Sequence, residues 1–281
     1  MTEITTRKMT QDDFAFAIRL TDTMHWDLTK KDFTFMMALE PKGCFVALDG
    51  VKRVGITTTA HFDKIGWIGN VIVDPRCRSK GIGARLVKEA IGYLSEKSVS
   101  TIGLYAYVNT VKFYKKIGFK ADSDFIRFAG QGIRNQVGAN AIRRMSQRDL
   151  NEVIDFDRSC MGWNRDRLLR RMFADSKDLC YIIREDSGLL GFVMADWYRQ
   201  EIGPIMCRAN SDDDPISLLK AVLSKLAGVE VRIGVSEARR RIVDALVDMD
   251  FKEEFRVTLM HLGEKLPDAR CLVAMESLER G

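Results

Sequence analysis

The stretch that decides the fold is VIVDPRCRSKGIGARLV, residues 71 to 87. It begins with the apolar run Val71 to Val73, continues into the basic loop RSKGIG (78 to 83) with its two glycines, and ends in apolar residues at helical spacing. This order predicts a strand, a loop and a helix start. Glycines let the backbone approach a ligand closely, and the amides of the loop and of the helix start favour an anion such as a pyrophosphate. Taken alone, the hexapeptide fits a plain strand-to-helix turn with solvated basic side chains equally well.

Two common phosphate-binding patterns do not fit this stretch. The Walker loop requires G-x-x-x-x-G-K-[ST], and the sequence contains no Gly-Lys-Ser or Gly-Lys-Thr. The Rossmann pattern G-x-G-x-x-G begins at Gly81 and Gly83 but has Leu86 at its last position. The pattern that remains is R-x-x-G-x-G between a strand and a helix.

Length and composition suit two domains of ordinary size. The chain has 281 residues, of which 46% are hydrophobic, and its 44 basic and 39 acidic side chains give a net charge of only +5. This balance does not favour nucleic acid as a partner. No apolar segment has the length of a signal peptide or a membrane span, and the six cysteines include no CxxC pair, which argues against a zinc site and a disulfide framework. We therefore expect a cytoplasmic protein with no metal, nucleic-acid or membrane partner, and we leave open whether it forms oligomers.

The sequence contains an internal repeat. TRKMTQDDF (6 to 14) matches IRRMSQRDL (142 to 150), and WIGNVIV (67 to 73) matches EIGPIMC (201 to 207). VKFYKKIGFK (111 to 120) matches VDALVDMDFK (243 to 252), so the offset changes by only a few residues over a whole half. Such a pattern predicts two copies of one domain.

Each copy reads as a mixed α/β (α+β mixed-sheet) domain. Thr10 with Asp13, and Ser146 with Asp149, fit a helix capping box, and residues 43 to 62 predict a hairpin that turns at Asp49-Gly50. We expect a first domain at residues 1–130, a glycine-rich linker at 131–140 and a second, diverged domain at 141–281.

The first copy resembles the GNAT superfamily of acyl-CoA-dependent N-acetyltransferases over residues 1 to about 128. VDPRCRSKGIGARLV is similar to the family's acyl-CoA loop, V-x-P-x-x-R-x-x-G-x-G, and FYKKIGF (113 to 119) is similar to its closing helix signature. The whole chain resembles two-domain members in which a catalytic GNAT domain precedes a diverged GNAT-like one. The resemblance implies acetyl-CoA as co-substrate and two tandem GNAT-like domains.

The resemblance also implies roles for individual residues. The strand Val71, Ile72 and Val73 would pair with the pantetheine arm, and Tyr114 would face the thioester sulfur. Many members have an asparagine seven residues before this tyrosine; here that place is Tyr107, and Asn109 is the nearby candidate for a pantetheine contact. The pyrophosphate would bind the loop and the helix start, with Arg78 and Lys80 adding charge and the backbone amides coming from Ser79, Lys80, Gly81, Ile82, Gly83 and Ala84.

The chemistry poses two proton problems. An alkylamine with a pKa of about 10.4 must lose its proton before it attacks, and the departing thiolate must be stabilised. Tyr114 suits the second task because a tyrosine with a pKa near 10 keeps its proton at any working pH. Many GNAT enzymes place a glutamate where this strand has Asn70, so the base is open: the candidates are water-relayed deprotonation or one of Asp22, His25, Asp27, His61 and Asp63. A backbone N–H of Val71 or a neighbour would bind the oxyanion.

The second copy lacks both functional features. Its loop reads RANSDDDPISLLK (208 to 220), without glycine and with three aspartates that would repel a pyrophosphate, and Leu246 stands where the first copy has Tyr114. Asp214 before Pro215 predicts an N-cap and a helix start. Its basic segment MGWNRDRLLRR (161 to 171) either reaches the first domain to select an acceptor or forms a solvated helix face.

We therefore expect an N-acetyltransferase that moves an acetyl group from acetyl-CoA to a small-molecule amine by direct attack in a ternary complex. The alternatives are a protein lysine or N-terminal acetyltransferase, and an acyl-CoA-binding regulator without turnover.

Overall fold

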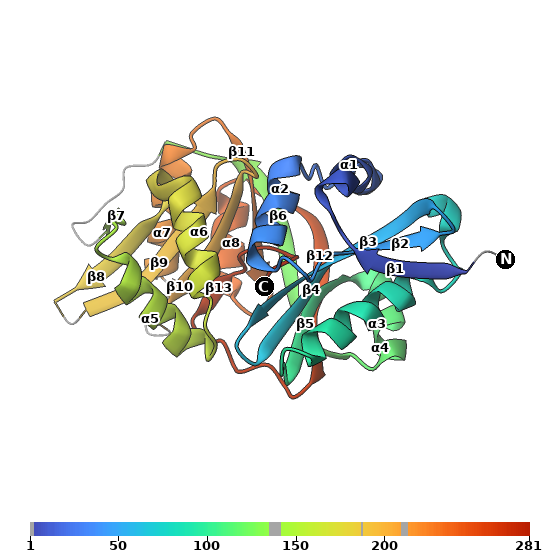
Figure 1. Cartoon of the computed structure of the whole chain (residues 1–281). Helices are drawn as coiled ribbons and strands as arrows, with labels where there is room; N and C mark the ends of the chain where they lie inside the picture. Colours follow the sequence, from blue (N-terminus) through green and yellow to red (C-terminus); the bar gives the residue numbers. More distant parts are fainter. Residues whose placement is uncertain (1–2, 135–141, 187, 209–212) are drawn as a thin grey trace.

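The computed structural model of the chain describes residues 3–134, 142–186, 188–208 and 213–281. Most of the expected linker, and Asp212 of the expected three-aspartate run, lie outside these residues. The described strands form one continuous mixed sheet in the order β1-β2-β3-β4-β5-β12-β6-β11-β13-β10-β9-β8-β7, which confirms the mixed α/β fold (Figure 1). The first half contributes β1 (Ile4–Lys8), β2 (Phe45–Asp49), β3 (Lys52–Phe62), β4 (Ile65–Val73), β5 (Thr101–Tyr107) and β6 (Lys120–Gln131). The second half contributes β7 (Ile142–Arg144), β8 (Tyr181–Glu185), β9 (Gly188–Asp196), β10 (Glu201–Cys207), β11 (Glu230–Ser236), β12 (Lys252–Gly263) and β13 (Leu272–Ala274).

Helices cover both faces of the sheet in the first half. α1 (Phe14–Asp22) and α2 (Lys30–Leu39) pack on one face in a cluster with Ile56 and Ile72. α3 (Ile82–Ser95) and α4 (Val111–Ile117) pack on the other face, in a cluster that includes Ile68. Ile68 and Ile72 are four residues apart on β4 and would share a face in a regular strand. They face opposite layers because β4 contains a bulge between them, which reverses the alternation.

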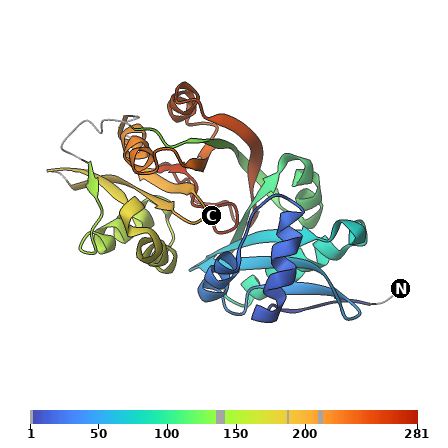
Figure 2. The same ribbon diagram turned by 90° about the horizontal axis from the view of Figure 1, so that it is seen from above.

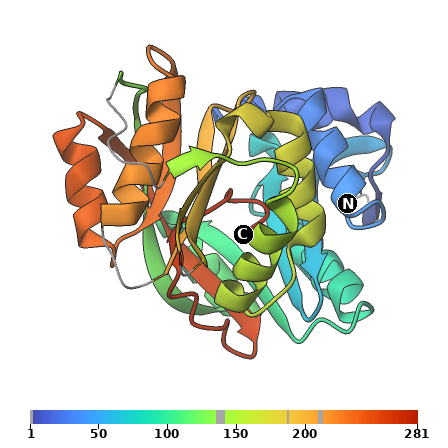
Figure 3. The same ribbon diagram turned by 90° about the vertical axis from the view of Figure 1, so that its left-hand side faces the viewer.

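The second half repeats this layering. α5 (Leu150–Met161) and α6 (Asp166–Ser176) pack on one face, and α7 (Asp213–Lys225) and α8 (Arg240–Asp248) on the other. Figure 3 shows these two pairs, yellow-green and orange, on either side of the strands. The cluster under α5 and α6 extends into the first half, where it includes Phe35 and Trp67. The two halves therefore share an apolar core, and in Figures 1 and 2 the end of the chain lies between them.

The last strands of the two halves are exchanged. β12 lies between β5 and β6, and β6 in turn lies between β12 and β11. The cores follow the same exchange, because Met260 of β12 packs with the first half's Leu104, whereas Ile126 of β6 packs with the second half's Val231. Each half thus completes its sheet with a strand from the other.

The predicted capping box of the first copy is confirmed, and the second copy has the carboxylate half of its predicted box. The Asp13 carboxylate accepts a hydrogen bond of 2.8 Å from the Thr10 amide, and Asp149 accepts one of 2.8 Å from the Ser146 amide. The carboxylates also pair with arginines at matching places in the repeat, at 2.7 Å between Arg7 Nη1 and Asp13 Oδ2 and at 2.6 Å between Arg143 Nη2 and Asp149 Oδ1.

Two predicted boundaries are displaced. Asp49 pairs with Lys52, so the hairpin turn consists of Gly50 and Val51 rather than Asp49-Gly50, because the left-handed φ of +61° falls on Gly50. Asp213 and Asp214 already belong to α7, so Asp214 is not its N-cap and Pro215 is not its first residue. A proline is tolerated anywhere in the first turn because the amides there have no intrahelical acceptor.

Candidate active site

The site begins where two parallel strands separate. β4 and β5 pair only between Ile65–Trp67 and Thr101–Gly103, and beyond this point the strands diverge. A cavity of about 1310 Å³ lies there, lined by the ends of both strands, the loop before α3, α4 and the loop between α1 and α2. The second half lines it with residues 198–201, which run from the loop after β9 to the start of β10, and with residues 278–280, which we call the tail. The cavity is therefore built by both halves.

The bulge of β4 opens directly into this cavity. Asn70 and Val71 together lie opposite the single residue Thr57, and Asn70 has a left-handed φ of +50°. Its side-chain amide donates to Thr58 Oγ1 at 3.1 Å, which holds this conformation. A bulge leaves one residue outside the regular ladder. The expected oxyanion donor, the amide of Val71 or a neighbour, thus belongs to the irregular part of the strand, and the role itself stays a prediction.

The loop before α3 has the geometry of an anion cradle. Ser79 and Gly81 have φ of +64° and +77°, which turns successive amides toward one side. Among the described residues, the amides of 79–84 find no backbone or side-chain acceptor, whereas the next amide, of Arg85, donates to Gly81 at 3.0 Å. A Cβ on Gly83 would stand 3.5 Å from the Phe113 ring, so the gap between loop and α4 is narrow. Six unpaired amides at a helix start can hold a pyrophosphate without further help.

Most of the predicted CoA residues line the cavity. They are Val71, Ile72, Val73, Arg78, Ser79, Gly81, Ile82, Gly83, Ala84 and Asn109. Lys80 is exposed and does not line it. Arg78 bends back over the strand, where its Nε donates to the Val73 carbonyl at 3.2 Å.

Tyr114 lies on α4, 8% exposed, between Phe113 and Phe119 at ring distances of 4.9 and 5.8 Å. It lines the cavity, and its hydroxyl has no hydrogen-bond partner among the described residues. Burial raises the pKa of Tyr114 above its ordinary value. The phenol therefore keeps its proton and has it available for a ligand.

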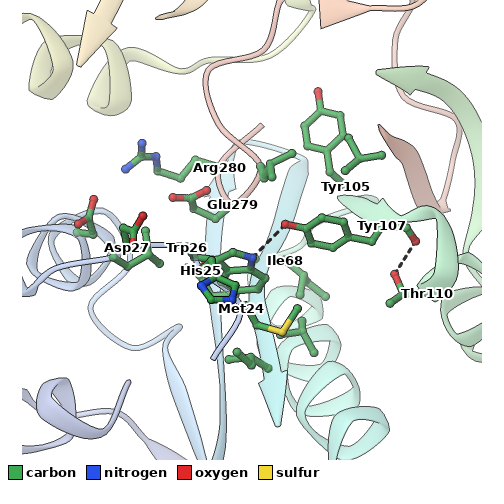
Figure 4. Close-up of a pocket in the computed structure, with 18 of the residues that line it drawn as sticks. Met24, His25, Trp26, Asp27, Ile68, Tyr105, Tyr107, Thr110, Glu279 and Arg280 are labelled. Atoms are coloured by element: carbon green, nitrogen blue, oxygen red, sulfur yellow. Dashed lines mark hydrogen bonds between the residues drawn. The ribbon is translucent and has the colours of Figure 1, made fainter. Parts of the chain in front are cut away.

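The loop between α1 and α2 forms one wall. Trp26 stacks on Tyr107 with ring centroids 6.4 Å apart, and its Nε1 donates to the Tyr107 hydroxyl at 3.0 Å (Figure 4). The tryptophan thereby ties the loop to β5. Residues with left-handed φ gather around the cavity: besides Asn70 and Ser79 they are His25, Asp27 and Gln200. Such conformations cost about 1 kcal/mol or more each and concentrate at functional sites.

The structure separates the candidate bases. His25 and Asp27 line the cavity, and Asp22 does not. His61 and Asp63 lie at the contact between the halves instead. His61 Nδ1 is 2.9 Å from Glu40 Oε2, and Asp63 accepts a hydrogen bond from the Asn164 amide at 3.2 Å.

A chain of largely buried ion pairs lines the part of the cavity that the second half contributes. Arg199 contacts three carboxylates: Asp32 at 3.6 Å, Glu201 at 3.4 Å and Glu279, to which it donates a hydrogen bond. Glu201 also pairs with Arg127 of β6, whose Nε is buried without a partner among the described residues. Burial raises the pKa of Glu201, but the charges of Arg127 and Arg199 outweigh it and hold that pKa well below its usual range.

These residues are separated by up to 247 positions along the chain, from Asp32 to Glu279, so no local motif announces them. The one available signal was Glu201, a carboxylate in an otherwise apolar strand pattern that predicts burial.

The segment MGWNRDRLLRR does contact the first half, but away from the cavity. Arg167 donates to the carbonyls of Leu39 and His61 at 2.8 and 3.0 Å. Arg165 is buried, pairs with Asp157 at 2.6 Å and donates to the Gly281 carbonyl at 3.1 Å. The segment joins the halves and positions the tail instead of selecting an acceptor directly.

In the second copy, a strand occupies the place of the cavity. β10 and β11 are parallel neighbours only at Glu201–Ile202 and Arg232–Ile233, so they separate as β4 and β5 do. β13 fills this gap, where Ala274 pairs with both Ile205 and Val235. Leu246, at the position of Tyr114, is fully buried in the core.

Comparisons with known proteins agree with this architecture. Residues 8–119 match the model described as the acetyltransferase (GNAT) family, and residues 153–273 match one described as an acetyltransferase (GNAT) domain. The chain is 25% identical over 262 residues to the holothin acyltransferase of Pseudoalteromonas sp. strain SANK 73390, covering 91% of this chain and 87% of that protein.

Among solved structures, a protein of Pyrococcus horikoshii described as a candidate acetyltransferase superposes with a TM-score of 0.83 at 18% identity, covering 100% of this chain and 97% of that one. A tandem GNAT protein from the clavulanic acid biosynthesis pathway superposes with a TM-score of 0.65 at 12% identity, covering 95% and 100%. The chain belongs to the GNAT acetyltransferases and has two GNAT domains in tandem.

No helix in the described ranges is long and apolar enough to cross a membrane. Within those ranges, no group of three or more His, Cys, Asp or Glu side chains is placed to hold a metal ion.

Proposed function

We propose that this protein transfers an acetyl group from acetyl-CoA to the amine of a small molecule in a ternary complex. The observation that carries the proposal is the continuous cavity, which runs from the unpaired amides of 79–84 past Tyr114 and the β4 bulge to the part lined by the second half. A cofactor-shaped entrance and a bounded acceptor end are what direct transfer requires, because both substrates must be held in reacting geometry at once. The similarity to a protein named holothin acyltransferase supports a small acceptor.

Each group of residues has a distinct role in this proposed reaction. The amides of 79–84 bind the pyrophosphate, and β4 residues 71–73 align the pantetheine arm. The ammonium group first loses one proton to water. The neutral amine nitrogen then attacks the thioester carbonyl, the new C–N bond forms, and the bulged amide near Val71 stabilises the oxyanion. The C–S bond breaks, Tyr114 donates a hydrogen bond to the departing thiolate sulfur, and the second proton leaves the nitrogen to water.

A protein acetyltransferase needs an acceptor groove open to a polypeptide. The tail instead covers β4, because a Cβ on Gly69 would stand only 2.5 Å from Glu279 Cβ. This closure favours a small molecule over a lysine or N-terminal peptide. We also keep the cytoplasm as the proposed compartment, since all six cysteines are free thiols.

The test is thiol release from acetyl-CoA over a panel of alkylamines, polyamines, amino acids, aminosugars and lysine or N-terminal peptides. We expect turnover with a class of small amines and at least 10-fold lower kcat/KM with peptides. Release with peptides alone would support the protein acetyltransferase. Tight acetyl-CoA binding without release on any amine would support the regulator.

A further inference from the structure

The tail places a carboxylate beside the expected reaction centre. Glu279 packs its backbone directly on Gly69, the residue before the Asn70–Val71 bulge, and its side chain lines the cavity. In Figure 4 it projects from the tail into the space that also holds Trp26 and Tyr107. Glu279 is 5% exposed.

The protein uses only part of the hydrogen-bonding capacity of the Glu279 carboxylate. Arg199 Nη1 donates to Oε1, and Oε2 accepts no hydrogen bond from the described residues. A carboxylate has about four acceptor sites in all. Glu279 can therefore accept a further donor from a molecule in the cavity without losing Arg199.

The charged groups around Glu279 also favour binding of a cation. The connected chain of cavity-lining ion pairs contains the carboxylates of Asp32, Glu201 and Glu279 but only the guanidiniums of Arg127 and Arg199. This group of ion pairs therefore has one more negative than positive charge. Neighbouring Arg280 does not offset that charge, because Glu276 holds it through two hydrogen bonds of 3.0 and 2.6 Å.

We propose that Glu279 binds the protonated amine of the acceptor, so that the site selects small cationic amines; the inference rests on the proposed acetyl transfer. The contact with Arg199 occupies one carboxylate oxygen and leaves the other for the ammonium group. Glu279 is therefore a binding residue that orients the nitrogen toward the bulge, and the proton leaves to water.

The test compares Glu279→Gln with the wild type on two acceptors of similar size. One is an alkylamine that is cationic at pH 7.5, and the other is an arylamine that is neutral there. A hydrogen bond to a charged group contributes enough to predict an increase in the alkylamine KM of about 10- to 150-fold. The KM values of the arylamine and of acetyl-CoA should stay within about 2-fold of the wild type.

Asp149→Asn is the matched control. Asp149 is also a buried carboxylate paired with an arginine, but it lies in the second half and does not line the cavity. The variant should lower the melting temperature without changing the ratio of the two amine KM values. An unchanged alkylamine KM in Glu279→Gln, or an equal rise for both amines, overturns the inference while acetyl transfer stands. No thiol release by the wild type with any amine removes the proposed function itself.

A second measurement needs only the wild type, in case Glu279→Gln does not fold. Protonated 2-(dimethylamino)ethanol and 3-methyl-1-butanol have the same shape and differ by the charged N–H group. The amine should compete with the acceptor at least 10-fold more strongly than the neutral alcohol. Equal or stronger competition by the alcohol contradicts a carboxylate-lined amine site.

Discussion

Replacing Tyr114 with phenylalanine removes one buried oxygen and leaves the ring packing with Phe113 and Phe119 in place. Burial raises the pKa of this phenol above about 10, whereas a thiolate leaving group resembles cysteine, with a pKa of about 8.5. Full proton transfer from Tyr114 is therefore uphill by more than about 1.5 units, or about 2 kcal/mol. We infer that Tyr114 acts by hydrogen bonding to the sulfur more than by releasing its proton.

The expected size of the effect follows from this role. A hydrogen bond to a charged group contributes about 1.5–3 kcal/mol, so kcat should fall by about 10- to 150-fold, against about 10²- to 10⁴-fold for a general acid. The KM for acetyl-CoA should change by less than about 2-fold. Because the pKa of Tyr114 is raised, ionisation of this phenol should not reduce kcat of the wild type below about pH 10.

The assay is steady-state thiol release between pH 6 and 10, with calorimetric acetyl-CoA binding to check the fold. Tyr93→Phe is the control, since it likewise removes one phenol oxygen from a helix. The Tyr93 hydroxyl of α3 donates a hydrogen bond to Glu40, and Tyr93 does not line the cavity. An unchanged kcat in Tyr114→Phe, or a change confined to acetyl-CoA affinity, would refute the reasoning.

Three further predictions concern the tail, the second copy and acid stability. Gly69→Ala places a Cβ about 2.5 Å from Glu279 and should raise the amine KM at least 10-fold with little change in the acetyl-CoA KM; equal KM values would show that the tail tolerates displacement. Calorimetry should find one acetyl-CoA per chain, because β13 fills the second gap, and a stoichiometry of two would contradict this. Asp149→Asn should cost about 1–3 kcal/mol at pH 7. Hydrogen bonds from Arg143 and Ser146 hold the pKa of Asp149 well below its usual range, so this stability is present above about pH 3.9 and is lost as the pH falls further. The difference in melting temperature between wild type and variant should therefore shrink below pH 4, and a constant difference would argue against the ion pair.

The sequence predicted the features that depend on residues close to one another along the chain. The loop before α3, the Tyr114 helix, the strand at 101–107 and the capping carboxylates Asp13 and Asp149 depend on residues within a few positions of one another, and the structure places them as expected. The repeat likewise predicted that the layers occur twice.

The pairing between distant strands was not predictable in this way. β12 between β5 and β6, and β13 in the gap of the second copy, result from packing of the whole chain. The acceptor end depends on the same long-range packing, because Arg199 and Glu279 meet only after the tail has docked on Gly69. Asn70 stands where many GNAT enzymes have a glutamate. No residue near it in the sequence indicated that Glu279, from the other end of the chain, would lie beside this strand.

The exchanged last strands bear on how this chain folds and on why its two halves stay together. When a ribosome has released residues up to 131, β5 exists but its partner β12 does not, since Tyr107 pairs with Val257. Pairing across about 150 residues is slow, and the edge of β5 stays open until nearly the whole protein has been made. Removing the second half would also remove β12, the strand that pairs with β5 and completes the sheet of the first half.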